Sequence, residues 1–94
     1  MSTLALADAP ADASISLTNP DGLYRGTFEN MVRALISDLL EDGEPVKAAI
    51  DTDDGNRAIA PVVAISTHDG AITLAKPIGE THVALDTIVG VHVL

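Results

Sequence analysis

Two hydrophobic patterns divide the chain, a helical one in its first half and a strand-like one in its second. From Phe28 to Leu40 the apolar residues recur three and four positions apart, which places them along one stripe of an α-helix. We therefore expect a helix over about 28–41, with Leu35 and Leu39 at the centre of the stripe that packs on the rest of the protein.

Each end of this predicted helix carries a residue that is typical of a helix terminus. Thr27 can cap the N-terminus, because its hydroxyl can accept a hydrogen bond from an amide of the first turn. Gly43 suits the left-handed residue that often follows a helix C-terminus. Ahead of the helix, Ile15 and Leu17 flank Ser16 in the alternation typical of a short edge strand.

Beyond residue 45, short apolar blocks are separated by turn residues. The blocks predict strands over 46–50, 58–67, 71–76, 81–85 and 88–94. Only Asp86 and Thr87 separate the last two, which predicts a tight corner, often 3₁₀. Pro61 cannot donate a ladder hydrogen bond, so its strand must bend, bulge or lie at an edge. The prediction is mainly β: an N-terminal α-helix followed by a five-stranded, strongly bent antiparallel small barrel over 45–94.

Length and composition set the domain organisation and exclude several partners. A chain of 94 residues predicts a single domain over 15–94, preceded by a disordered or mobile tail over 1–14. A net charge of −9 disfavours non-specific attraction to phosphate backbones. The chain has no cysteine and its first residues do not resemble a signal peptide, which favours the cytoplasm. No stretch approaches the roughly 20 apolar residues of a membrane span, so no membrane partner is expected.

The motifs of catalysis and of cofactor or metal binding are not found. His68, His82 and His92 could in principle supply three imidazoles to a metal, but they lack the local spacing of a metal motif. Residues 51–56 depart from the EF-hand pattern and instead predict an acidic hairpin turn. The glycines are dispersed and form no phosphate-binding cluster. We therefore expect no enzyme, cofactor or metal.

One small grouping combines an aromatic residue with basic ones. Tyr24 and Arg25 precede the predicted helix, and Arg33 lies on its polar side. These residues could contact a nucleic acid or an acidic partner. We favour solvated positions that hold the chain where it enters the helix.

The order of predicted elements resembles the Sm-like family, whose small barrels are also SH3-like and which includes bacterial host-factor RNA chaperones. The resemblance covers residues 28–94. It is carried by Pro45 to Ile50, the turn Asp54-Gly55, the block Val62 to Ser66 leading into His68-Asp69-Gly70, and Val83 to Val89.

The resemblance implies a closed homo-oligomeric ring, in which the fourth strand of one subunit pairs with the fifth strand of the next. The residues of that edge would be Thr81, Val83, Leu85, Val89, Val91 and Val93. It also implies single-stranded RNA as ligand, bound by two loops on one face: Thr67, His68, Asp69 and Gly70 in the first, Asp86 and Thr87 in the second. The chain departs from the family pattern because no basic dipeptide occupies the second loop. The last strand, without charge or proline and with one edge expected to be unpaired, also predicts self-assembly.

A second resemblance leads to a different function. The helix, the barrel and the run from Val83 to Ile88 are similar to small acidic Rho-binding antiterminators. That similarity implies a module that binds another protein through its acidic surface and does not bind nucleic acid. The charge of the chain fits this alternative, whereas the alanine-rich helix and the terminal strand fit the ring, which we rank first.

Overall fold

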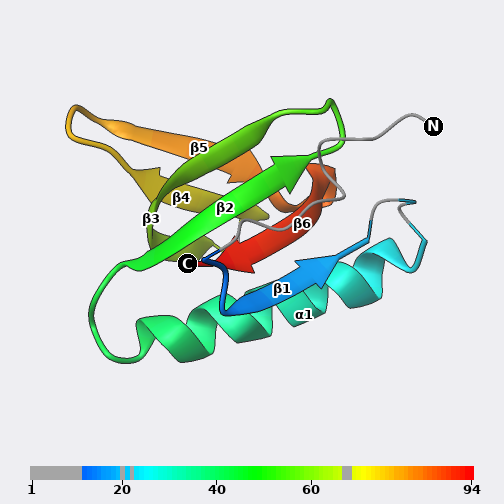
Figure 1. Cartoon of the computed structure of the whole chain (residues 1–94), viewed down its shortest axis with the longest axis horizontal. Helices are drawn as coiled ribbons and strands as arrows, with labels where there is room; N and C mark the ends of the chain where they lie inside the picture. Colours follow the sequence, from blue (N-terminus) through cyan, green and yellow to red (C-terminus); the bar gives the residue numbers. More distant parts are fainter. Residues whose placement is uncertain (1–11, 20, 22, 67–68) are drawn as a thin grey trace.

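The structure, a computed structural model, describes residues 12–19, 21, 23–66 and 69–94. In these residues one helix accompanies six strands that form a single antiparallel sheet (Figure 1). The elements in chain order are β1 (Ile15–Thr18), α1 (Arg25–Leu40), β2 (Val46–Thr52), β3 (Arg57–Ser66), β4 (Ala71–Ala75), β5 (Glu80–Ala84), the 3₁₀ turn η2 (Leu85–Thr87) and β6 (Ile88–Val93).

The mainly β class is confirmed, but the sheet is not the expected five-stranded barrel. Its strand order is β1-β6-β2-β3-β4-β5, so β1 and β5 are the terminal strands of an open sheet. The strand at 15–18, which precedes the helix, pairs with β6 and adds a sixth member to the sheet. Closure would need β5 to pair with the other end, and the described strands show no such pairing.

The bend expected at Pro61 is present as a bulge in β3. Pro61 lies opposite Lys47 of β2, and the register of β3 with β4 shifts between Val62 and Ala64. A bulge tolerates the missing amide of proline and increases the local twist of the strand. The expected corner between the last two strands is the 3₁₀ turn η2. Both features follow from the local sequence.

The helix begins three residues earlier than expected and is not capped by Thr27, which lies inside it. Tyr24 is the N-cap residue, with a left-handed φ of 57° and no side-chain capping hydrogen bond. Its carbonyl accepts the amide of Phe28 at 2.9 Å, which starts the helical ladder. At the other end Gly43 has a φ of 83°, as expected for the residue past a helix C-terminus.

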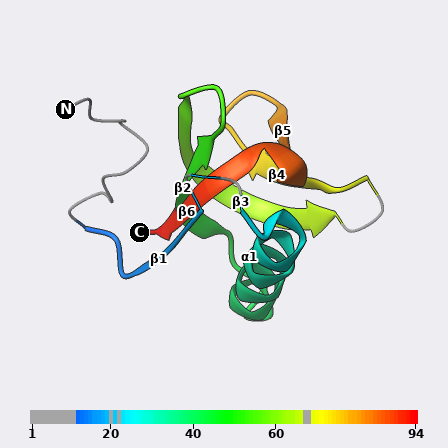
Figure 2. The same ribbon diagram turned by 90° about the vertical axis from the view of Figure 1, so that its right-hand side faces the viewer.

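The core lies between α1 and one face of the sheet (Figure 2). Phe28, Val32 and Ile36 form the buried line of the helix, whereas Leu35 and Leu39 are only partly buried. The buried stripe is therefore rotated away from the centre predicted, because α1 packs on β3, β2 and η2. The strands contribute Val46, Ala48, Ile50, Val62, Ile72, Leu74, Ile88, Val91 and Val93 to the same cluster, and η2 contributes Leu85.

The short edge strand expected at 15–18 is confirmed, and its position corrects another expectation. Ile15 lies opposite Val93 and Leu17 opposite Val91, so β1 covers the outer side of β6. The other side of β6 pairs with β2. The terminal strand therefore has no unpaired edge in this fold, contrary to the premise on which assembly through it was expected. Assembly itself stays a prediction.

The difference in burial between neighbouring helix residues predicts a difference in stability. Ile36→Ala should lower the free energy of unfolding by about 2 to 5 kcal/mol, because Ile36 is fully buried and truncation leaves a cavity. Leu35→Ala should lower it by clearly less, because Leu35 is only partly buried. Urea denaturation of both variants measures this, and an equal or larger loss for L35A would contradict the packing.

Candidate functional site

The two loops predicted to bind RNA lie against each other. The amide of Leu85 donates a hydrogen bond of 2.7 Å to the carbonyl of Gly70, which joins the β3–β4 connection to the turn after β5. Asp69 and Asp86, one from each of these loops, are both exposed. The loop surface therefore carries two exposed carboxylates, which repel phosphate.

The remaining loop residues are Thr87, which has a structural role, and Thr67 and His68. The Thr87 hydroxyl donates a hydrogen bond of 2.8 Å to the carbonyl of Ala84 and so closes the 3₁₀ turn. This bond uses the donor that would otherwise be available to a ligand. Thr67 and His68 lie outside the described residues.

The residues predicted for an oligomer edge do not share one accessible edge. Thr81 and Val83 lie on β5, which is a terminal strand. The other four are buried, one in η2 and three on β6: Leu85, Val89, Val91 and Val93. A neighbouring subunit could reach β5 directly, but it could pair with β6 only after displacing β1.

A polar network with a buried centre runs across four strands of the sheet, from the terminal strand β1 to β3, on the face opposite the helical core. His92 and Asp51 are both 0% exposed. A hydrogen bond of 2.9 Å joins His92 Nδ1 to Ser16 Oγ, and one of 3.0 Å joins His92 Nε2 to Asp51 Oδ2. Arg57 donates to both carboxylate oxygens of Asp51, from Nε at 2.5 Å and from Nη2 at 2.9 Å. The network thus links β1, β6, β2 and β3.

Gly90 provides the space in which Asp51 and His92 meet. It lies opposite Asp51 in the pairing of β2 with β6. A Cβ at this position would lie 3.1 Å from Asp51 Oδ2 and 3.5 Å from His92 Nε2. A larger residue would therefore push the carboxylate away from its partners.

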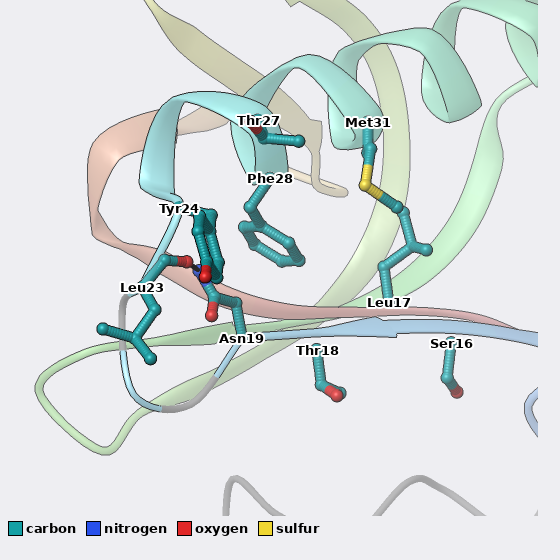
Figure 3. Close-up of a pocket in the computed structure, with 9 residues that line it drawn as sticks. All are labelled: Ser16, Leu17, Thr18, Asn19, Leu23, Tyr24, Thr27, Phe28 and Met31. Atoms are coloured by element: carbon teal, nitrogen blue, oxygen red, sulfur yellow. Dashed lines mark hydrogen bonds between the residues drawn. The ribbon is translucent and has the colours of Figure 1, made fainter.

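Serine, histidine and aspartate are the residue types of a nucleophilic relay, but their surroundings indicate a structural network. Arg57 engages both oxygens of the carboxylate, and the imidazole is fully buried. Ser16 points from β1 away from the helix and from the pocket described below (Figure 3). A buried charge with these partners holds strands in register. Sequence reasoning missed the network because its members are brought together only by strand pairing.

The other two candidate metal residues do not join it. His82 Nδ1 lies 3.0 Å from the Thr73 hydroxyl on a neighbouring strand, and His68 lies outside the described residues. Within the ranges that the structure describes, no group of three or more histidine, cysteine or acidic residues is placed to hold a metal ion. The same part of the chain contains no helix of the length and apolarity that a membrane span needs.

The predicted acidic hairpin turn between β2 and β3 comprises residues 53–56, because Asp51 and Thr52 are the last residues of β2. Thr52 Oγ1 donates to Asp54 Oδ1 at 2.5 Å, and the amide of Asn56 donates to the same oxygen at 3.2 Å. These hydrogen bonds, that of Thr52 first, lower the pKa of Asp54. Their contribution to stability is present above the ordinary carboxyl pKa and is lost as the pH falls through the lowered one.

An apolar pocket of about 510 Å³ lies between β1 and the first turns of α1. Its apolar walls are Leu17, Leu23, Tyr24, Phe28 and Met31. Figure 3 shows Leu17 and Met31 pointing toward each other across it. The Asn19 amide group donates to the carbonyl of Leu23 and so fixes the connection between strand and helix.

The mouth of this pocket exposes large apolar side chains. Leu23, Tyr24 and Met31 are 60%, 83% and 48% exposed. Tyr24 also has a positive φ, a conformation that is unfavourable for most residues other than glycine, asparagine and aspartate. Sequence reasoning placed Tyr24 before the predicted helix, and the structure makes it the N-cap residue. The sequence did not identify the pocket, because β1 and α1 form it jointly.

Comparison of the chain with protein-family models, with curated proteins and with solved structures found no match. The two resemblances noted in the sequence therefore stay expectations. Two surfaces remain from which a function can be inferred: the acidic pair of loops and the apolar pocket beside β1.

The structural role of the network predicts a large effect of Asp51. Asp51→Ala should lower the free energy of unfolding by about 3 to 5 kcal/mol, because it removes the carboxylate that both the buried His92 and Arg57 contact. Asp53→Ala is the matched control, since it removes the same charge from an exposed side chain. Urea denaturation measures both, and equal stabilities would show that the network does not stabilise the fold.

Proposed function

We propose that this protein is a non-enzymatic interaction module that binds a cationic segment of another protein. The observation that supports this function is the pocket beside β1, where exposed apolar side chains gather on a strongly acidic chain. Apolar residues scattered singly over a surface need no explanation, whereas a contiguous group around a pocket is typical of a binding site.

The conformation of Tyr24 supports the same conclusion. A tyrosine at a φ of 57° is strained, and here the strain is combined with 83% exposure of the side chain. Burial of the ring within the protein therefore does not compensate for the strain. Exposed tyrosines are enriched among the residues that dominate binding at protein interfaces.

The acidic surface favours a protein over a nucleic acid. Asp69 and Asp86 occupy the two loops that RNA would contact, and the net charge of the chain is −9. Single-stranded RNA is bound by cationic grooves and by aromatic rings on which bases stack. Neither loop contains a phenylalanine, tyrosine or tryptophan, and the one aromatic ring in them is the imidazole of His68.

An Sm-like ring that binds single-stranded RNA is the second candidate function. It is favoured by the long bent β3, by the 3₁₀ turn between β5 and β6, and by the outer side of the terminal strand β5, which pairs with no other strand of the described residues. Such a ring would require β1 to leave β6 so that β5 of a neighbour could take its place.

Selection from a library of random peptides distinguishes the two functions. The immobilised protein should enrich basic peptides that contain large apolar residues, and calorimetry should show affinities that fall as salt is added. Labelled uridine-rich and adenine-rich oligonucleotides should not bind at low salt. Oligonucleotide binding without enrichment of any peptide would contradict the proposed function, as would a ring-sized native mass that persists while RNA is bound.

Tyr24→Asn separates binding from stability. Asparagine tolerates the left-handed conformation, so the free energy of unfolding should not fall. Loss of the ring should weaken the affinity for the selected peptides at least about tenfold. Ile78→Asn is the matched control, because it removes an exposed apolar side chain outside the pocket. Unchanged affinity in Y24N would exclude the pocket mouth from the binding site.

A further inference from the structure

We propose that an extended peptide binds along the outer edge of β1, adds a seventh strand to the sheet and inserts an apolar side chain into the pocket beside α1. This inference rests on the proposed function and specifies how the partner is recognised. Strand addition takes affinity from main-chain hydrogen bonds and specificity from a pocket that receives alternate side chains.

The outward direction of the main chain of β1 follows from its pairing with β6. The amide of Asn19 donates a hydrogen bond of 2.7 Å to the carbonyl of Val89, which continues the register of β1 with β6. Successive main-chain groups of a strand point to opposite sides. The amides and carbonyls of Ser16 and Thr18 therefore point away from β6, toward the side on which β1 has no neighbouring strand in the described sheet.

The side chains of β1 place the pocket where an added strand can reach it. Leu17 points toward Met31 on α1, whereas Ser16 and Thr18 point to the opposite face of the strand (Figure 3). Side chains of an added strand would alternate in the same way. Every second side chain would thus face the helix, and the pocket of about 510 Å³ would receive one large apolar side chain.

The chemistry of the partner follows from charge. Asp12 and Asp21 lie before and after β1 and are both exposed, on a chain whose net charge is −9. An extended segment that alternates basic with aliphatic residues complements both the acidic flanks and the pocket. The other terminal strand, β5, fits this partner less well, because the described pockets do not adjoin it.

The probe is a blocked heptapeptide in which lysine alternates with valine and leucine. Added to the ¹⁵N-labelled full chain, it should shift the amide signals of residues 15–18 and slow hydrogen exchange at Ser16 and Thr18. Slowed exchange is the signature of new main-chain hydrogen bonds. Shifts confined to the loops of Asp69 and Asp86 would overturn strand addition while leaving peptide binding, and hence the proposed function, in place.

Thr18→Pro tests the main-chain contact directly. Proline removes an amide that points away from β6, and an edge strand tolerates proline at such a position, so the fold should be retained. The affinity for the probe should fall at least about tenfold. Thr18→Val keeps the amide and should stay within about twofold of the wild-type affinity. Amide spectra outside β1 report that both variants are folded.

Other outcomes of these experiments would overturn strand addition, the proposed function or the assignment of a partner peptide. Equal affinity of T18P and wild type overturns strand addition, and so does a wild-type protein that binds library-selected peptides but not the alternating probe. A wild-type protein that binds neither overturns the proposed function together with this inference. A dimer that light scattering detects and that T18P dissociates would place a second copy of the chain at this edge and overturn the assignment of a partner peptide.

Discussion

The pairing of β1 with β6 is the contact on which the rest of the structure depends. β1 precedes the helix in sequence, so its attachment to β6 decides where the chain enters α1. It also covers the outer side of β6, which would otherwise be a long apolar edge open to other chains. A strand of four residues thereby ends the sheet, positions the start of the helix and forms one wall of the pocket.

A charge network holds this short strand in register. Four residues of β1 provide few ladder hydrogen bonds, and the Ser16 contact with His92 adds a directional one. His92 in turn contacts Asp51, whose charge is balanced by Arg57. Because an unpaired buried charge is expensive, a slip of either β1 or β2 by one residue would break this network as well as reverse the apolar faces.

The same arrangement gives the two faces of the sheet different roles in stabilising the fold. The helical core side provides packing, and the network on the other face provides register. The proposed peptide site is the rim where β1 meets α1, because main-chain groups point outward there beside an apolar pocket and a strained tyrosine. The loops that an RNA-binding ring would use lie on other elements and are acidic.

The local sequence determined the elements of this protein, and tertiary pairing determined how they are used. The apolar stripe from Phe28 predicts the helix, and apolar blocks separated by turn residues predict the strands. Pro61 predicts a bend, a bulge or an edge position, and the two-residue break at Asp86-Thr87 predicts the corner. These signals act between residues close in sequence. The open six-stranded sheet, the coverage of β6, and the meeting of Ser16 with His92 and Asp51 join residues far apart in sequence; Ser16 and His92, for example, are 76 positions apart. No local pattern encodes such contacts. They arise because the helix and hairpins that lie between β1 and β6 in sequence bring the two ends of the chain together in the folded protein.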